Sequence, residues 1–225
     1  MSEGKPVIGI LGGTGGLGTG LARRWLQAGY QVIIGTRDAD KGLSAVADLQ
    51  RVMAERGVGP VEVSALDYAG TASAADIVVL SVPFSHQADV LTSVREQLQG
   101  KVLVDTTVPL RPPKVSLVQL PESGSAGQIA QDLLGEGVHV VSAFQNVPAP
   151  RLKEDAPLEC DVLVCGNNKD ARAQVIRLVE AAGMRGLHAG QINNAAAVEA
   201  LTSVLIFINR QFNSHAGIGI TGLDA

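Results

Sequence analysis

The sequence predicts an α/β fold in which a doubly wound parallel sheet is followed by a small, mainly helical C-terminal domain. Short runs rich in β-branched residues alternate with longer stretches that carry apolar residues at helical spacing, which is typical of parallel strands joined by crossover helices. Most of the strand-like runs are almost continuously apolar, as expected where helices cover both faces of a sheet. The 225 residues suffice for a large domain, residues 1–150, and a smaller one, residues 151–225.

Each expected strand is a short β-branched run, and each expected helix is a longer stretch with apolar residues at helical spacing. The strands are expected at PVIGILG (6–12), QVIIGT (31–36), VEVSAL (61–66), DIVVLSVP (76–83), KVLVDTT (101–107), HVVSAF (139–144) and DVLVCGN (161–167). The helices are expected at 17–29, 38–57, 70–75, 85–100, 128–137, 169–183 and 193–215. Most of these helices end in glycine, whereas the last is apolar on most sides and is expected to be buried.

Composition argues against several classes of function. A net charge of −4, a pI near 5.5 and an aromatic content of 3% argue against a nucleic-acid partner, because phosphate backbones attract an excess of basic residues. The N-terminus has no basic and apolar leader pattern, so we expect a cytoplasmic protein. The longest apolar run, LTSVLIFI (201–208), is far shorter than the roughly 20 residues of a membrane-spanning helix, so no membrane association is expected.

Five glycines occupy the seven positions 12–18, which begin with the last residue of the first expected strand. Gly13, Gly15 and Gly18 match the pattern G-x-G-x-x-G between a strand and a helix, which is the dinucleotide fingerprint of Rossmann-like folds. The first glycine permits a tight turn, the second permits close approach of a pyrophosphate, and the third permits close packing of the helix. The free N–H groups at the helix N-terminus favour an anion. The alternative is a glycine-rich turn without a ligand.

The second expected strand ends in Thr36 and Arg37, where NAD-specific sites usually carry an acidic residue. Arg37 offers a planar set of donors to a 2′-phosphate, and Thr36 and Lys41 add a hydroxyl and a second positive charge. The sequence therefore predicts NADP as the cofactor. Asp38 is expected to cap the following helix. Alternatively, Arg37 and Lys41 are solvated surface charges.

A third stretch, SVPFSH, follows the fourth expected strand at the edge where ligands bind in such sheets. Ser81, Val82 and Pro83 are expected to line the cofactor path, and His86 either reaches the nicotinamide or caps and packs a helix.

We find no nucleophile with its base, no clustered metal ligands, and no redox pattern at Cys160 and Cys165. We therefore expect no catalytic acid, base or metal, which suits hydride transfer between two bound ring systems.

Several blocks together resemble one family, the NADPH-dependent reductases of coenzyme F420. They are LGGTGGLGTGLA, GTRDADK, SVPFSH, VVSAFQNVPA, DVLVCGN, LHAGQINNAAAVEALTSVLIFINRQF and GIGI, and they cover almost the whole chain. The resemblance implies a Rossmann-like domain with a small C-terminal domain, usually in a dimer. It also implies NADP(H) as cofactor and the deazaflavin F420 as co-substrate, bound in a cleft against the nicotinamide.

The resemblance also implies positions for both ligands. NADP contacts fall on Thr14, Gly15, Gly16, Leu17, Thr36, Arg37, Lys41 and Ala149, and deazaflavin contacts fall on Thr107, Val108, Pro109, Gln145, Asn146, Val147, Pro148 and Ala149, with the GIGI segment (217–220) nearby. At the position of Gln145 the archaeal members carry histidine, so this chain departs from the family pattern beside the acceptor.

The expected function is therefore oxidoreductase activity that moves hydride between NADP(H) and coenzyme F420. The dinucleotide domain is also similar to the cytoplasmic part of membrane-bound metalloreductases, which leaves an NADPH-dependent reductase of FMN or FAD as the enzyme alternative. An NADP-binding regulatory protein is the alternative without catalysis. The apolar middle of the helix at 193–215 exceeds what a small domain needs to cover, so we expect a homodimer that buries part of this helix.

Overall fold

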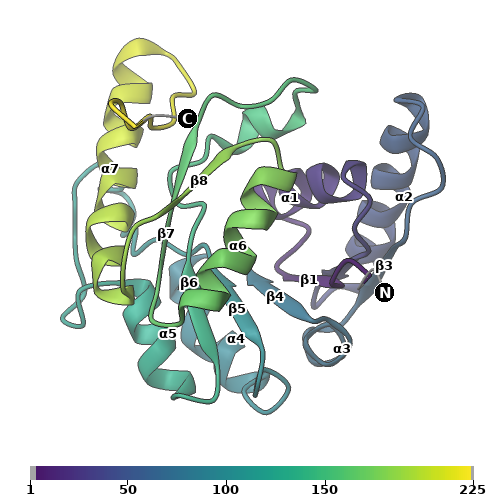
Figure 1. The fold of residues 1–225 in the computed structure, drawn as a ribbon, viewed down its shortest axis with the longest axis horizontal. Coiled ribbons are helices and arrows are strands. Elements are labelled where there is room, and N and C mark those ends of the chain that lie inside the picture. The colour runs from purple at the N-terminus through teal and green to yellow at the C-terminus, as the bar shows by residue number, and fades with distance from the viewer. Residues whose placement is uncertain (1–3, 224–225) are drawn as a thin grey trace.

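The computed structural model describes residues 4–223, which form an eight-stranded sheet with the strand order β3-β2-β1-β4-β5-β6-β7-β8 (Figure 1). All neighbouring strands are parallel except β6 and β7, which are antiparallel. This confirms the predicted α/β class and the Rossmann-like order of the first strands. The strands are β1 (Ile8–Leu11), β2 (Val32–Gly35), β3 (Val63–Leu66), β4 (Ile77–Leu80), β5 (Val102–Asp105), β6 (His139–Ser142), β7 (Asp161–Gly166) and β8 (Arg185–His188).

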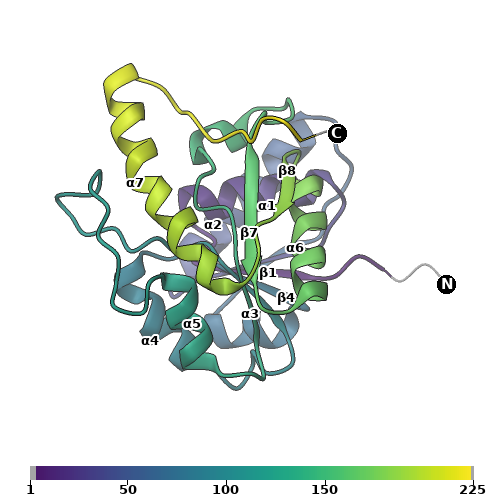
Figure 2. The same ribbon diagram turned by 60° about the vertical axis from the view of Figure 1, so that its left-hand side comes forward.

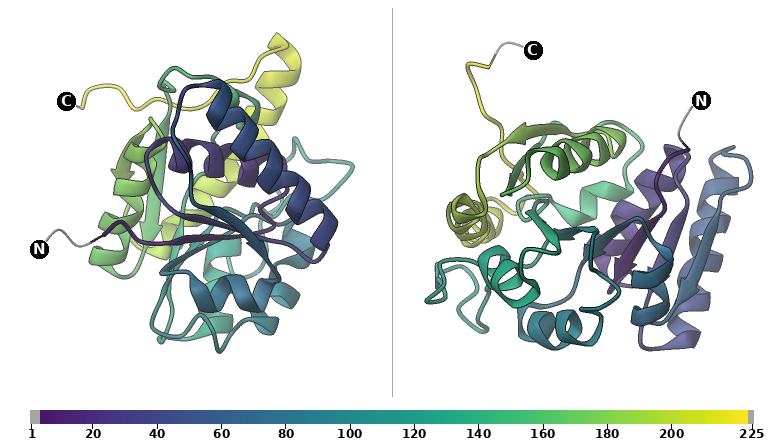
Figure 3. Two further views of the ribbon diagram at one scale, coloured as in Figure 1. Left: turned by 90° about the vertical axis from the view of Figure 1, so that its right-hand side faces the viewer. Right: turned by 60° about the horizontal axis from the view of Figure 1, so that its bottom comes forward.

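The helices lie on both faces of the sheet, as Figure 3 shows. They are α1 (Gly16–Gln27), α2 (Ala39–Glu55), α3 (Tyr68–Ala74), α4 (Gln87–Ser93), α5 (Ala126–Leu134), α6 (Lys169–Ala181) and α7 (Ala195–Phe212), with short 3-10 turns η1 (Phe84–His86), η2 (Ala149–Lys153) and η3 (Ile192–Asn194).

Each face of the sheet has its own hydrophobic core. Ile8 and Ile10 of β1 point to one face, where they join a cluster that contains residues of α1, α2 and α6. Leu11 joins a second cluster on the opposite face, with residues of α3, α4, α5 and α7. This two-sided burial explains why the strand sequences read as continuous apolar runs.

The chain beyond residue 150 continues the same sheet through β7 and β8. The strand at β7 was predicted, but β8 was not, because Arg185–His188 contains one large apolar residue and pairs only with β7 at the edge. The expected helix 85–100 is also shorter, since its regular part ends at Ser93 and turns follow. The expected boundary at residue 150 falls within η2, and a division into two domains there stays a prediction.

The last helix is less buried than its sequence predicts. Figure 2 shows α7 crossing the sheet end and projecting beyond it. Within the described residues, Ile192–Phe212 is the one helical segment long and apolar enough to cross a membrane, with a mean hydropathy of 1.3. The same length and composition occur in core helices of soluble proteins, and one third of this segment is buried against the fold. One face of α7 therefore packs on the protein, and the other remains exposed.

Candidate functional site

The turn between β1 and α1 is shaped by glycines that no other residue could replace without a clash. A Cβ at Gly13 would lie 2.8 Å from the carbonyl oxygen of Ile10, and a Cβ at Gly18 would lie 2.9 Å from the Cα of Gly13. Gly12, which the fingerprint does not include, has a φ of +80°, and a Cβ at this position would collide with the carbonyl oxygen of Ser81. In contrast, a Cβ placed at Gly16 would have no other atom within 4 Å. The turn is closely packed toward the protein and open on its outer side.

The N-terminus of α1 keeps its N–H groups free. Gly15 is the N-cap and provides no side-chain cap, and the first turn contains no acidic residue. By comparison, α2, α3, α5 and α6 are each capped by a side chain, those of Asp38, Asp67, Ser125 and Asn168. An uncapped helix start beside an open glycine turn fits a pyrophosphate, because free N–H groups and the helix dipole both attract an anion.

The residues after β2 fit a 2′-phosphate. Arg37 is exposed and takes part in no hydrogen bond or ion pair within residues 4–223. Asp38 accepts the backbone N–H of Lys41 at 3.1 Å, which confirms that it caps α2. Lys41 also lies 3.5 Å from the Asp38 carboxylate on the surface. The hydroxyl of Thr36 bonds to the backbone of Asp38, so Thr36 shapes the turn rather than projecting freely.

A cleft of about 540 Å³ lies where the carboxyl ends of β1, β4, β5 and β6 meet. This is the edge at which open α/β sheets bind ligands, next to the point where the strand order reverses. The cleft brings together the predicted residues Gly15, Gly16, Leu17, Ser81, Val82, Pro83, Thr107, Val108, Gln145, Val147 and Ala149. A larger groove of about 740 Å³ lies between α1 and α2, and Thr14 and Lys41 line it. We assign the chemistry to the cleft because the glycine turn opens into it.

Of the residues predicted to lie near the nicotinamide or the deazaflavin, four lie outside the cleft lining. His86 is exposed at the end of η1, and Pro109 and Pro148 are buried beside the cleft without lining it. Asn146 points into the protein, where its amide donates to the carbonyl oxygen of Val198 at 3.0 Å. The segment 217–220 runs beside β7, and the backbone N–H of Asp161 donates to Ile218 there.

Gln145 lines the cleft, but its amide is tied to the protein. Its Nε2 donates to the carbonyl oxygen of Asp105 at 2.9 Å and to the hydroxyl of Ser142 at 2.8 Å. Its Oε1 is buried and has no partner among the described residues. The residue that departs from the family pattern therefore supports the cleft wall.

The structure adds cleft residues that the sequence did not indicate. Phe144 lines the cleft with a φ of 73°, a strained backbone conformation for an aromatic residue. Its ring contacts Trp25 of α1 edge-on, with centroids 6.0 Å apart. A loop that returns over the cleft contributes Leu110, Pro112 and Val115, and the remaining additions are Phe84, Ser85 and Thr106. The hydrophobic character of Phe144 was visible in the sequence, but its backbone conformation was not.

Two buried carboxyl groups lie beneath the cleft. Asp105 accepts Gln87 Nε2 at 2.5 Å and the backbone N–H of Thr107 at 2.9 Å, yet burial raises its pKa to about 6. Glu199 of α7 accepts the first N–H groups of α5, and burial, together with the charge of Asp105, raises its pKa to about 8. Neither group lines the cleft.

The part of the chain that the structure describes contains no candidate metal site and no thiol placed for catalysis. No group of three or more His, Cys, Asp or Glu side chains there could hold a metal ion. Cys160 and Cys165 are both buried free thiols, and burial raises the pKa of Cys165 to about 11. A high thiol pKa keeps the nucleophilic thiolate scarce.

Comparisons with known proteins identify the family of this chain. The family model described as NADP oxidoreductase, coenzyme F420-dependent, matches residues 7–109. The F420-dependent NADP reductase of Methanothermobacter thermautotrophicus is 38% identical over 96% of this chain and 95% of its own length, and that of Methanocaldococcus jannaschii is 36% identical over 96% and 99%. The crystal structure of a putative F420-dependent NADP reductase from Arthrobacter sp. FB24 has a TM-score of 0.76 and 26% identity, and the match covers 94% of this chain and 96% of that one. This chain belongs to the family of F420-dependent NADP reductases.

Proposed function

We propose that this protein is an oxidoreductase that transfers a hydride between NADP(H) and coenzyme F420. The observation that carries the proposal is the cleft of about 540 Å³, which begins at the open glycine turn and ends at Ala149 and Thr107. The full-length similarity to F420-dependent NADP reductases supports the same conclusion. The proposal includes a cytoplasmic location.

The residues present fit NADP. The uncapped N-terminus of α1 and the open side of Gly15 and Gly16 would hold the pyrophosphate, and Arg37, with Lys41, would hold the 2′-phosphate. Ala149 and the segment Ser81–Pro83 would flank the nicotinamide. NADPH, when bound, supplies the hydride.

The acceptor side of the cleft fits a flat ring system. Thr107, Val108 and Val147 line it together with Leu110 and Val115, and most of these side chains are apolar. Apolar walls exclude water and hold two rings at a fixed separation, so positioning supplies most of the rate acceleration, on the order of 7–11 kcal/mol. The described cleft lining contains no His, Asp, Glu, Lys or Cys. The side chains therefore orient the rings, and the proton that the reduced deazaflavin takes up along with the hydride comes from solvent.

An anaerobic assay tests the proposal. The protein is mixed with NADPH and, in separate reactions, with F420, FMN or FAD, and the absorbance of each acceptor is followed. We expect NADPH-dependent bleaching of F420 and a far slower reaction with either flavin. Reduction of the flavins alone would identify a flavin reductase instead. Tight NADPH binding without reduction of any acceptor would favour a regulatory protein.

We also propose that the protein acts as a homodimer through α7. The exposed side chains of this helix include Val204, Phe207 and Phe212, of which the last two are 57% and 68% exposed. A soluble protein that exposes large apolar side chains along one helix usually covers them with a partner. A second copy of the chain provides an identical apolar surface, as in a two-fold symmetric interface.

A further inference from the structure

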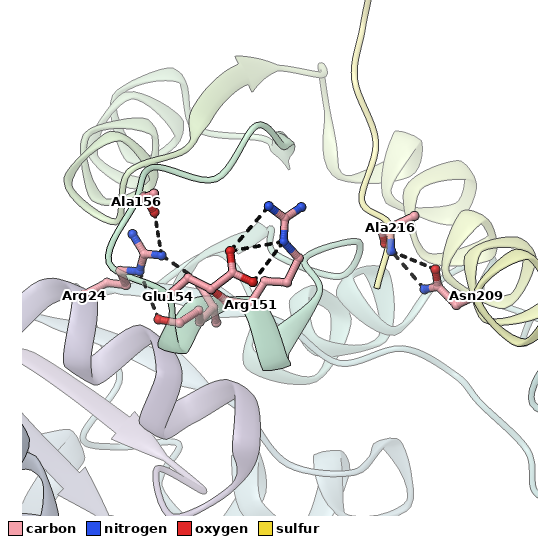
Figure 4. Close-up of polar contacts among 7 residues, drawn as sticks. Arg24, Arg151, Glu154, Ala156, Asn209 and Ala216 are labelled. Carbon is pink, nitrogen blue, oxygen red and sulfur yellow. Dashed lines mark hydrogen bonds and ion pairs between the residues drawn. The ribbon is translucent and has the colours of Figure 1, made fainter. Parts of the chain in front are cut away.

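A buried arginine connects the nucleotide-binding helix to the segment that carries Ala149. Arg24 lies on α1, is 5% exposed, and directs its guanidinium at the backbone of residues 151–156 (Figure 4). Nε donates to the carbonyl oxygen of Leu152 at 3.0 Å, and one terminal nitrogen donates to the carbonyl oxygen of Ala156 at 3.0 Å. The same nitrogen lies 3.5 Å from the carbonyl oxygen of Arg151.

Every hydrogen bond that the Arg24 side chain donates to a described residue goes to a backbone carbonyl group. Within residues 4–223, Arg24 forms no ion pair, although Glu154 lies near enough to stabilise its charge. Burial lowers the pKa of Arg24, because the charged form is removed from water. An apolar side chain could fill the same volume without that desolvation cost. The guanidinium instead offers a planar set of donors, which fixes the orientation of the backbone that it binds.

A second contact holds the same segment against α1. The side chain of Leu152 is fully buried, and a Cβ placed at Gly20 would lie 2.8 Å from its Cβ and Cδ1. Gly20 therefore allows η2 to approach the helix closely, one turn before Arg24. Gly20 lies outside the dinucleotide fingerprint, so the nucleotide turn does not explain it.

Both contacts affect the distance between the two walls of the cleft. Gly16 and Leu17, in the first turn of α1, line one wall, and Ala149, the first residue of η2, lines the other. Arg24 and Gly20 join the same helix to the same short turn. Any change in their contacts with η2 therefore alters the separation between the glycine turn and Ala149.

We propose that Arg24 is a positioning residue for hydride transfer, which sets the place of Ala149 relative to the glycine-rich turn through the carbonyl groups of Leu152 and Ala156. The inference rests on the proposed function. It predicts that loss of the guanidinium leaves NADPH binding at its phosphate groups intact and slows the transfer step.

The test compares Arg24→Met with Arg24→Lys and with the control Arg172→Met. Arg172 also donates to a backbone carbonyl, that of Gly166, but it lies on α6 and does not line the cleft. Three quantities are measured for each variant: the dissociation constant of NADPH, the single-turnover rate of F420 reduction, and amide hydrogen exchange in residues 147–156.

For Arg24→Met we expect faster exchange in residues 149–156, a dissociation constant within about twofold of wild type, and a transfer rate at least about tenfold lower. Arg24→Lys, which keeps the charge and part of the hydrogen bonding, should recover part of the rate. Arg172→Met should match wild type in all three quantities. An unchanged rate despite faster exchange would overturn the inference, and so would a parallel loss of NADPH affinity and rate.

Gly20→Ala provides an independent variant if Arg24→Met fails to fold. Its added methyl group collides with Leu152 and displaces η2 while Arg24 remains, and alanine favours the helix. We expect slower transfer at saturating NADPH, and a wild-type rate would contradict the inference. The dissociation constant of NADPH is measured in parallel, because Gly20 also lines the groove that contains Lys41. If wild-type protein reduces no deazaflavin, the proposed function fails separately. The positioning role of Arg24 is then tested by the fluorescence of bound NADPH and by the amide exchange rates of residues 149–156. Wild-type values of both quantities in Arg24→Met would overturn that role.

Discussion

Glu199 of α7 accepts the backbone N–H of Ala126 at 2.7 Å, inside the protein, and thereby joins the last helix to the N-terminus of α5. Burial raises the pKa of Glu199 to about 8, from a usual value of 4.5. A folded-state pKa above the unfolded value means that the folded protein binds the proton more tightly. The associated stabilisation is complete below about pH 4.5 and is lost as the pH rises through about 8.

The free energy of unfolding should therefore fall between pH 5 and pH 9, and Glu199→Gln should remove much of that fall. Urea denaturation of both proteins across this range provides the measurement. Asp105→Asn serves as a comparison, since the pKa of Asp105 is raised only to about 6 and its effect should be complete by about pH 7. Equal pH dependence in wild type and Glu199→Gln would contradict the assignment.

Arg37→Ala should weaken the binding of NADPH far more than that of NADH. Only NADPH carries the 2′-phosphate whose charge-assisted hydrogen bonds are lost, at a cost of about 1.5–3 kcal/mol, or roughly ten- to a hundredfold in affinity. Fluorescence titration with both nucleotides measures the effect. Arg177→Ala is a suitable control, because Arg177 is exposed on α6 and lines neither the cleft nor the groove between α1 and α2. An equal loss for both nucleotides would exclude Arg37 as the phosphate ligand.

Ala149→Phe should abolish transfer while NADPH still binds. The larger side chain would fill the cleft beside the nicotinamide, but the phosphate contacts at α1 and Arg37 lie elsewhere. Titration and single-turnover kinetics separate the two effects. Ala149→Ser, which adds a single oxygen atom, is the matched control and should retain transfer. Full activity in Ala149→Phe would place the reacting rings in another part of the protein.

His86→Ala should lower turnover by less than about a hundredfold, which is the low end expected for a general acid or base. His86 is exposed at the end of η1 and does not line the cleft, whereas the neighbouring Pro83 and Ser85 do. Steady-state assays over a range of pH check this expectation. An inactive His86→Ala protein with normal NADPH affinity would show that the histidine takes part in the reaction.

Phe207→Asp should convert the proposed dimer into a monomer, because a charge at an apolar interface is desolvated without a partner. Sedimentation at micromolar concentration compares this variant with wild type. Leu43→Asp is the control, since Leu43 is 66% exposed on α2, away from α7. A wild-type protein that sediments as a monomer would contradict the proposed homodimer through α7.

The local patterns of the sequence predicted most of the sheet and the glycine turn between β1 and α1. Gly13 and Gly18 could be identified as turn residues, because the steric requirements of a turn between a strand and a helix depend on only a few neighbouring residues. Asp38 could be identified as a cap for the same reason. The wall formed by Val108 and Val147 followed from resemblance to a family rather than from spacing.

What the sequence could not predict depends on contacts between distant segments. The left-handed backbone of Phe144, the return of Leu110 and Val115 over the cleft, and the edge strand β8 have no local pattern. Arg24 reads as one of two charged residues in an amphipathic helix, although it lies buried against a segment 128 residues away. Glu199 likewise lies in an apolar helix whose sequence suggests no buried acid.

Direct transfer of hydride between the two coenzymes can be followed with isotopically labelled NADPH. NADPH that carries deuterium stereospecifically at the transferred position is reacted once with F420 on the protein, and the reduced deazaflavin is analysed by mass spectrometry and NMR. We expect that deuterium from one face of the nicotinamide arrives at a ring carbon of the deazaflavin, with a slower single-turnover rate than for unlabelled NADPH. Deazaflavin that is reduced without deuterium, its new hydrogen coming from solvent, would contradict transfer between rings held together in the cleft.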